Sequence, residues 1–305
     1  MQVNQGVRMI KSDNQPKKVL KVGLPKGSLQ ESTFDLFRRA GFAISCDSRS
    51  YFPSVNDPEI ECILFRAQEM SRYVQEGVID IGLTGYDWIC ENESKVVEIC
   101  ELVYSKTSKK PARWVLAVPA ESKIEKPEDL QGGIVATELV NVTKSFFTSR
   151  GVDVRVEFSW GATEVKARLL SGIVELTETG SSLRANNLRI IADVLESTPR
   201  LIANSEAWND PWKRNKAECI TLLVKGAIEA AFKVGLKMNV PETAMAEVLG
   251  ILPAEKSPTV STLAEKGWSA IEVILEETQE RELVPLLKKA GATGIITYPL
   301  NKVIP

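Results

Sequence analysis

The sequence predicts an α/β protein with two lobes around a cleft and a separate C-terminal domain. Three observations lead to this prediction. Between residues 18 and 188, strand patterns alternate with helix patterns of about 10 residues, as in mostly parallel sheets with helices on both faces. Strand patterns at 189–208 then return toward the first lobe. Residues 233–300 follow the order β-α-β-β-α-β, which is that of a ferredoxin-like fold.

The first lobe is expected at residues 18–107 and 196–225, after a polar, aperiodic extension at 1–17 that should be flexible. Its units are a strand at 19–25 with a helix ending at Gly41, a strand at 61–66 with a helix ending at Gly77, and a buried strand with a glycine turn at 78–89. The first helix should turn Leu29, Phe34 and Phe37 inward.

Polar residues follow the ends of these strands: Lys26 and Gly27 after the first, Arg66 after the second and Asp87 after the third. Open α/β sheets bind ligands at the carboxyl ends of their strands. A lysine on such a turn can reach a phosphate or carboxylate at the helix start. A solvated lysine, a salt bridge or a capping group would explain the same residues, so both interpretations stay open.

The second lobe is expected at residues 108–195. Its strands are predicted at 113–119, 133–138 and 152–158, and its helices at 126–132, 141–151 and 162–172. Glu138 lies at a strand-to-helix junction, so it should face the same side as the segment that follows.

That segment, residues 173–188, reads as a short strand, a polar turn and a helix. The turn contains Glu175, Glu178, Thr179, Gly180, Ser181 and Ser182. Gly180 allows close approach of the backbone to an anion, and amides at a helix N-terminus attract negative charge. The acidic residues suit Mg²⁺ or sugar hydroxyls. An ordinary turn with a serine N-cap is an equally good interpretation of the turn alone.

A long helix is predicted at 211–231, with Asp210 as its cap and Pro211 in its first turn. Its buried stripe should contain Ile220, Leu223, Val224, Ala227 and Ala231. The C-terminal domain is expected at 226–305, and such small appended domains often bind effectors or mediate assembly.

Composition narrows the function. The net charge of −2 gives no reason to expect nucleic acid or a membrane surface as a partner, and no apolar run approaches the roughly 20 residues of a membrane span. Five cysteines without CxxC spacing indicate reduced thiols in a cytoplasmic protein. The absence of histidine excludes a histidine general base, a Ser-His or Cys-His pair and a histidine-ligated metal.

Six segments, in this order, closely resemble ATP phosphoribosyltransferase. They are VGLPKGSL at 22–29, residues 51–89, GIVATELVNVTKSFF at 133–147, ELTETGSSLRANNL at 175–188, and residues 258–275 and 291–304. The resemblance spans about residues 18–305 and includes the third domain of the long, histidine-regulated form. It implies two periplasmic-binding-protein-like (type II) lobes. The segment LLSG at 169–172 departs from the family pattern, in which an acidic residue precedes this strand.

The resemblance implies a glycosyltransferase that moves the phosphoribosyl group of phosphoribosyl pyrophosphate (PRPP) to N1 of ATP, the first step of histidine biosynthesis. It also implies Mg²⁺ as cofactor, histidine as feedback inhibitor, and dimers that assemble into hexamers. Adenine N1 is unprotonated near neutral pH, so this chemistry needs positioning and fixed charge and no histidine base. A non-catalytic small-anion or nucleotide-binding or regulatory protein of the same fold remains the alternative.

Matching the motifs assigns roles to residues. The implied catalytic residues are Lys26, Arg66 and Glu175. The implied PRPP-binding residues are Glu175, Glu178, Thr179, Gly180, Ser181, Ser182 and Leu183, with Glu175 and Glu178 near the metal. The ATP and pyrophosphate side would contain Lys26, Gly27, Arg66, Asp87 and Glu138, and histidine would bind near Thr259, Ser261, Ala292 and Thr293.

Overall fold

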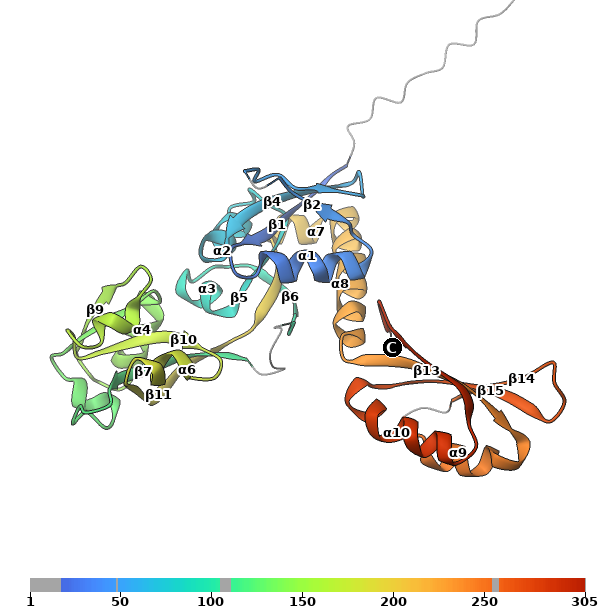
Figure 1. Ribbon diagram of the computed structural model, residues 1–305. Coiled ribbons are helices and arrows are strands. Elements are labelled where there is room, and N and C mark those ends of the chain that lie inside the picture. Colours follow the sequence, from blue (N-terminus) through green and yellow to red (C-terminus); the bar gives the residue numbers. More distant parts are fainter. Residues whose placement is uncertain (1–17, 48, 105–110, 254–257, 305) are drawn as a thin grey trace, which may run out of the picture.

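The computed structural model describes residues 18–47, 49–104, 111–253 and 258–304. The predicted extension at 1–17 lies outside these residues. The described chain forms two lobes, each around a five-stranded sheet, and a C-terminal domain around a four-stranded sheet (Figure 1). The fold class predicted from the sequence is confirmed, with one difference: both lobe sheets are mixed and not mostly parallel.

The sheet of lobe I has the strand order β4-β1-β5-β12-β6. Its elements are β1 (Leu20–Lys26), α1 (Gln30–Ala40), β4 (Ile60–Arg66), α2 (Ala67–Gln75), β5 (Ile81–Gly85), α3 (Tyr86–Glu91), β6 (Val97–Glu101) and β12 (Pro199–Ala203), with a small hairpin of β2 (Ile44–Ser45) and β3 (Ser54–Val55). Strand β1 runs parallel to β4 and β5, whereas β12 runs antiparallel to β5 and β6. Helix α1 ends where predicted, at Gly41 with φ 105°, and buries Phe37.

The sheet of lobe II has the order β11-β7-β10-β8-β9. Its elements are β7 (Ala112–Pro119), the 3₁₀-helix η1 (Pro127–Leu130), β8 (Ile134–Thr137), α4 (Val140–Thr148), β9 (Arg155–Phe158), α5 (Thr163–Lys166), β10 (Gly172–Thr177), α6 (Ser181–Ala185) and β11 (Leu188–Ser197). Strand β11, expected to return to lobe I, instead pairs antiparallel with β7. Only β12 crosses back, and Ser205–Asn209 form helix α7 in place of the predicted strand end.

Helix α5 is much shorter than the predicted helix at 162–172. It contains only Thr163–Lys166 and begins after Ala162, which has φ 49°. Most helical stability in proteins comes from burying an apolar face. Here Val165 and Leu169 are 63% and 80% exposed and only Ala167 and Leu170 among the apolar side chains pack on the core, so a longer helix would bury only a narrow apolar stripe.

The unusual segment LLSG is held firmly in this sheet. The amide of Ser171 donates to the carbonyl of Ile134 at 3.0 Å, and the amide of Ile134 donates to Ser171 Oγ at 3.1 Å. These two bonds connect the approach to β10 with the start of β8. The strand that leads to the polar turn is therefore anchored without the acidic residue of the family pattern.

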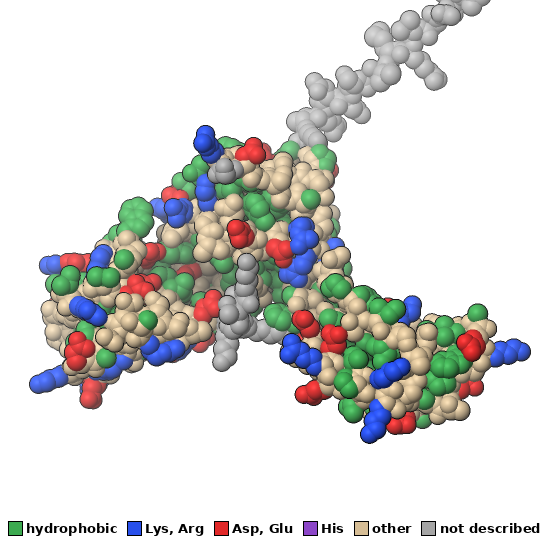
Figure 2. All heavy atoms as spheres, viewed as in Figure 1, with side chains coloured by type: hydrophobic (Ala, Val, Ile, Leu, Met, Phe, Trp, Pro, Cys, Tyr) green, Lys and Arg blue, Asp and Glu red, His purple; other side chains and the backbone are tan. Residues whose placement is uncertain are grey.

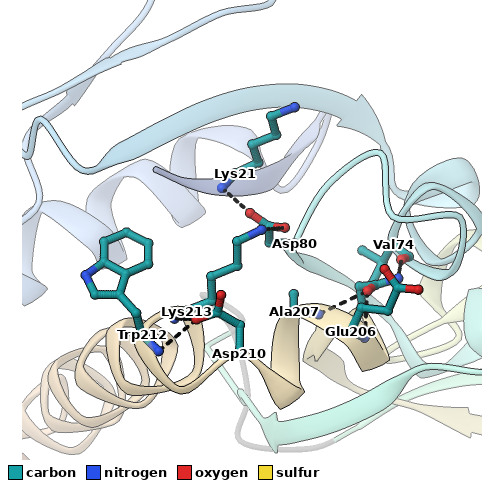
Figure 3. A network of polar contacts seen from close by, with 9 residues as sticks. Lys21, Val74, Asp80, Glu206, Ala207, Asp210, Trp212 and Lys213 are labelled. Atoms are coloured by element: carbon teal, nitrogen blue, oxygen red, sulfur yellow. Dashed lines mark hydrogen bonds and ion pairs between the residues drawn. The ribbon is translucent and has the colours of Figure 1, made fainter. Parts of the chain in front are cut away.

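Helix α8 (Pro211–Ala230) connects lobe I to the C-terminal domain (Figure 1). Asp210 caps it as predicted, accepting from the amides of Trp212 and Lys213 at 2.8 and 3.1 Å. The buried Asp80 accepts from Lys213 Nζ at 2.7 Å and from the Lys21 amide at 2.9 Å, which ties α8 to β1 (Figure 3).

The buried stripe of α8 differs slightly from the prediction, because Ala230 is buried in place of Ala231 and Leu223 is half-buried. The predicted domain boundary at residues 225 and 226 falls inside this helix. Ala227, just beyond that boundary, belongs to the core of lobe I.

The C-terminal domain is an antiparallel sheet with two helical segments. Its elements are β13 (Lys233–Pro241), the 3₁₀-helix η2 (Glu242–Ala244), α9 (Met245–Ile251), β14 (Thr259–Thr262), β15 (Trp268–Glu276), α10 (Glu277–Lys289) and β16 (Thr293–Pro299). The strand order β14-β15-β13-β16 is that of the predicted ferredoxin-like fold. The chain end returns to lobe I, where the Val303 amide donates to the Gly226 carbonyl at 2.9 Å. Among the described residues, no helix is long and apolar enough to span a membrane.

Candidate active site

A cleft with a cavity of about 580 Å³ lies between lobes I and II. Seven of the predicted site residues line it: Lys26, Gly27, Arg66, Asp87, Glu138, Glu175 and Glu178. They come from five strand ends in two sheets, so the tertiary fold brings together residues that are up to 152 positions apart in the sequence (178 − 26).

The lobe I wall carries the cations. Lys26 and Arg66 are partners in the parallel register of β1 and β4, at the carboxyl ends of both strands. The Lys26 ammonium lies 3.5 Å from the ring centroid of Tyr51, a cation–π contact that holds the side chain without neutralising its charge. Two adjacent positive charges at a strand edge can bind a polyphosphate.

Asp87 lines the cleft, but its carboxylate is already engaged. The side chain is 4% exposed, and its Oδ2 accepts a hydrogen bond from Trp114 Nε1 of lobe II at 2.7 Å. Its Oδ1 accepts from the Trp88 amide at 3.1 Å. Burial raises the pKa of Asp87, and these hydrogen bonds oppose the increase. The structure therefore places Asp87 as a connection between the lobes at the floor of the cleft.

The lobe II wall carries carboxylates. Glu138 lies between β8 and α4, whereas Glu175 and Glu178 lie on and just after β10. Burial raises the pKa of Glu175 most strongly, a hydrogen bond from Thr163 lowers it, and the charges of Glu164 and Glu138 raise it further. The carboxylates that line this wall give it negative charge, which a cation or hydroxyl donors could balance.

The predicted phosphate loop follows the cleft residues but does not line the cavity itself. Gly180 adopts φ 72°, and its amide donates to Thr177 Oγ1 at 2.7 Å. The hydroxyl of Ser182 donates to Glu164 Oε1 at 2.7 Å, and the hydroxyls of Thr179 and Ser181 are 3.0 Å apart. The loop has the left-handed glycine and the hydroxyls expected of an anion cradle.

Leu183 differs from the other predicted loop residues. Its side chain is 1% exposed and belongs to the hydrophobic core of lobe II. Its backbone amide lies in the first turn of α6, where amides lack intrahelical acceptors, so only the backbone of Leu183 remains as a donor for a ligand.

Several site residues were missed from the sequence. Trp88 and Trp114, in an edge-to-face contact with centroids 6.2 Å apart, line the cleft. Thr163 and Glu164 of the short helix α5 contact Glu175 and Ser182. The tryptophans look like ordinary core residues in a strand and a helix. No local signal indicates the α5 contacts, because Glu164 and Ser182 are 18 residues apart.

The predicted effector residues do not form one site within a single chain. Thr259 and Ser261 lie exposed on β14, at one edge of the four-stranded sheet. Thr293 begins β16 at the opposite edge, and Ala292 is completely buried in the core before it. Two strands separate the two halves.

Comparison with known proteins decides the family. Residues 66–226 match the family model of ATP phosphoribosyltransferase, and residues 230–302 match the model described as HisG, C-terminal domain. The chain is 58% identical over 94% of its length to ATP phosphoribosyltransferase of Chlorobium luteolum, covering 98% of that protein. This chain belongs to the ATP phosphoribosyltransferase family.

Other relatives agree. ATP phosphoribosyltransferase of Desulforudis audaxviator is 59% identical over 94% of this chain and 99% of its own length. A chain of the ATP phosphoribosyl transferase (HisG:HisZ) complex from Thermotoga maritima has a TM-score of 0.58 and 26% identity. That match covers 68% of this chain and 99% of the Thermotoga chain. The family resemblance found in the sequence is thus confirmed, including the C-terminal domain.

Proposed function

We propose that the cleft between lobes I and II transfers the phosphoribosyl group of PRPP to N1 of ATP, giving phosphoribosyl-ATP and pyrophosphate. Membership of the ATP phosphoribosyltransferase family supports this activity. The observation that carries the proposal is the pairing of a cationic wall with an anionic wall in one cavity. The cations suit polyphosphate, and the carboxylates suit ribose hydroxyls and a metal ion.

Lys26 and Arg66 are proposed to bind the pyrophosphate group as it leaves. Their neighbouring positions in the β1–β4 register aim two positive charges at one region of the cleft. Such preorganised charge stabilises a leaving anion at no cost of reorganisation. No proton needs to be removed from adenine N1, which agrees with a chain that has no histidine.

The loop Thr179–Ser182 is proposed to hold the 5′-phosphate of PRPP. Its left-handed Gly180, its hydroxyls and the first amides of α6 support this role. Glu175 and Glu178, between this loop and the cavity, would then accept hydrogen bonds from the ribose hydroxyls. The ribose would lie between the loop and the cations of lobe I, with its C1′ facing the cavity.

The carboxylates of lobe II would bind Mg²⁺ only together with oxygen ligands from the substrate. No group of three or more acidic, cysteine or histidine residues that could hold a metal occurs among the described residues. Mg²⁺ is usually bound by one or two carboxylates together with substrate phosphates. We propose Glu175 and Glu178 as these carboxylates; the ion would supply charge neutralisation for pyrophosphate.

The decisive experiment mixes the full-length protein with ATP, PRPP, Mg²⁺ and pyrophosphatase and follows the ultraviolet absorbance of phosphoribosyl-ATP. We expect product to form, and to form only when both substrates are present. Calorimetric binding of ATP with no product under these conditions would instead favour the non-catalytic binding protein.

We also propose that the protein is a histidine-inhibited oligomer, dimeric and hexameric, in the cytoplasm. Large apolar side chains lie exposed on lobe II and the C-terminal domain, including Trp160 at 88%, Leu169 at 80% and Ile296 at 57%. Figure 2 shows hydrophobic side chains on the surface of both parts. Exposed apolar surface of this kind is typical of interfaces. A second copy could also complete the effector site by joining the two sheet edges. Sedimentation with and without histidine tests both points.

A further inference from the structure

Helix α3 connects the two lobes behind the cleft. It belongs to lobe I, where Asn92 at its C-terminal end donates to the carbonyl of Gln68 at 2.9 Å and to Ser71 Oγ at 3.0 Å, both on α2. The hydroxyl of Ser71 donates back to the Trp88 carbonyl at 3.0 Å. The backbone of α3 is therefore bonded to lobe I, whereas the side chains of Asp87, Trp88 and Glu91 contact lobe II.

Both carboxylate oxygens and the backbone carbonyl of Glu91 accept hydrogen bonds from lobe II. Its Oε1 accepts from the Asn141 amide at 3.0 Å, and its Oε2 accepts from the amides of Asn141 and Val142 at 2.9 and 3.0 Å. The side chain of Asn141 donates to the Glu91 carbonyl at 2.9 Å. Glu91 is 9% exposed and so caps the first turn of α4 from the opposite lobe.

Asp87 makes a second connection from the same side of α3. It lies one turn before Glu91 and accepts from Trp114 Nε1 of β7 at 2.7 Å. Residues four positions apart share one face of a helix. Together with the ring contact between Trp88 and Trp114, these hydrogen bonds fix α3 to lobe II both at the cleft lining and, through Glu91, outside it.

The start of α4, which Glu91 binds, also determines where the lobe II wall of the cleft lies. Glu138 lies two positions before the first residue of α4 and lines the cleft, whereas Asn141 and Val142 in the first turn of the same helix are bound by Glu91. Thr137 Oγ1 accepts from the Leu139 amide at 3.0 Å, which makes this junction compact. A shift of the α4 start would therefore displace Glu138.

We infer that Glu91 is a positioning residue that sets the separation between the two cleft walls by holding the start of α4 against α3. The inference rests on the proposed function, since the walls are those that would bind ATP and PRPP. Glu91 does not line the cleft and has no contact with the reacting atoms. Its effect on the reaction is through alignment, to which bimolecular transfers are sensitive.

The test compares Glu91→Gln with Glu93→Gln, which removes one negative charge from an exposed residue two positions later. A glutamine offers one acceptor oxygen, and its NH₂ group would face an amide donor of α4. For Glu91→Gln we expect kcat/KM to fall about 10- to 100-fold, and the radius of gyration from small-angle X-ray scattering to increase. Glu93→Gln should match the wild type in both measurements.

Asn141→Ala provides a milder variant in case Glu91→Gln does not fold. It removes only the bond to the Glu91 carbonyl, and we expect a smaller decrease of kcat/KM in the same direction. Folded variants whose melting temperature falls while kcat, KM and scattering stay at wild-type values would overturn the inference. An inactive wild type would refute the proposed function instead, and the scattering comparison would still decide the role of Glu91.

Discussion

The two walls of the cleft are built on different principles. Lobe I presents two long cationic side chains, Lys26 and Arg66, at the ends of neighbouring parallel strands. Lobe II presents carboxylates, and the glycine turn just beyond the cavity has groups that are already hydrogen-bonded, as Ser182 is to Glu164 and Gly180 is to Thr177. The cationic wall can adapt to a polyphosphate, whereas the anionic wall is preformed and must exchange internal bonds for bonds to substrate.

This difference predicts where each wall is vulnerable. Removing a charge from lobe I should affect the rate and leave stability unchanged, because few structural bonds depend on it. Changes in lobe II should affect substrate binding and stability together, because its groups are packed and mutually bonded. Single substitutions in each wall and in the C-terminal domain can test this contrast.

Lys26→Ala should lower kcat/KM by about 100- to 1,000-fold, the typical loss when one preorganised charge is removed from a developing anion. The melting temperature should stay within error of the wild type. Lys21→Ala is the control, because Lys21 lies exposed on the same strand and does not line the cleft. Wild-type kinetics for Lys26→Ala would remove this residue from the site.

Gly180→Ala should raise the KM for PRPP by about 5- to 30-fold, because a left-handed alanine costs about 1–2 kcal/mol and the proposed phosphate loop would shift to relieve that strain. Its Cβ would also lie 3.0 Å from Arg184 Nη1. Gly132→Ala is a matched control, with the same φ of 72° at a position where a Cβ would meet nothing within 4 Å. Both variants should lose similar stability. A raised KM in both would show that strain alone, and not loop geometry, causes the effect.

Glu175→Gln should change the pH dependence of stability. The pKa of Glu175 in the native state is raised above its ordinary value of 4.5, chiefly by burial. At pH values between the unfolded-state pKa and the native-state pKa, the native state therefore binds more protons than the unfolded state. The contribution of Glu175 to stability therefore falls as pH rises through this range. The glutamine variant should be more stable than the wild type at neutral pH and lose less stability between pH 4.5 and neutrality.

Denaturant titrations of wild type and Glu175→Gln over that pH range measure the free energy of unfolding. A separate assay should show that Glu175→Gln has lost activity. Glu178→Gln is the control, because it removes an exposed carboxylate from the same wall. Parallel stability curves for wild type and Glu175→Gln would contradict the expectation.

The smallest effect is expected in the C-terminal domain. The double variant Thr259→Ala/Ser261→Ala should weaken histidine binding by about 1 kcal/mol for each hydrogen bond lost, with uninhibited turnover unchanged. Isothermal titration measures the affinity, and Thr262→Ala, on the opposite face of the same strand, is the control. Unchanged histidine affinity would place the effector site elsewhere.

The helices and strands were predicted from the sequence more accurately than the pairing of the strands. Hydrophobic period and glycine stops predicted β1, α1 and the C-terminal domain, because these signals lie within a few neighbouring residues. The antiparallel places of β11 and β12 were missed, because strand pairing depends on contacts over long sequence separations. The shortness of α5 was missed because it depends on which side chains after Lys166 reach the core: Ala167 and Leu170 do, whereas Leu169 stays exposed.

In the candidate site, too, features set by neighbouring residues were predictable, whereas features set by long-range contacts were not. The family, the ferredoxin-like domain and the residue types at the strand ends were predictable from the sequence, since these depend on local composition and order. Only the tertiary structure decided that Asp87 and Glu91 join the lobes, that Leu183 is in the core and that the effector residues lie at opposite sheet edges. Each of these is set by which side chains meet across distant segments, and packing alone determines that.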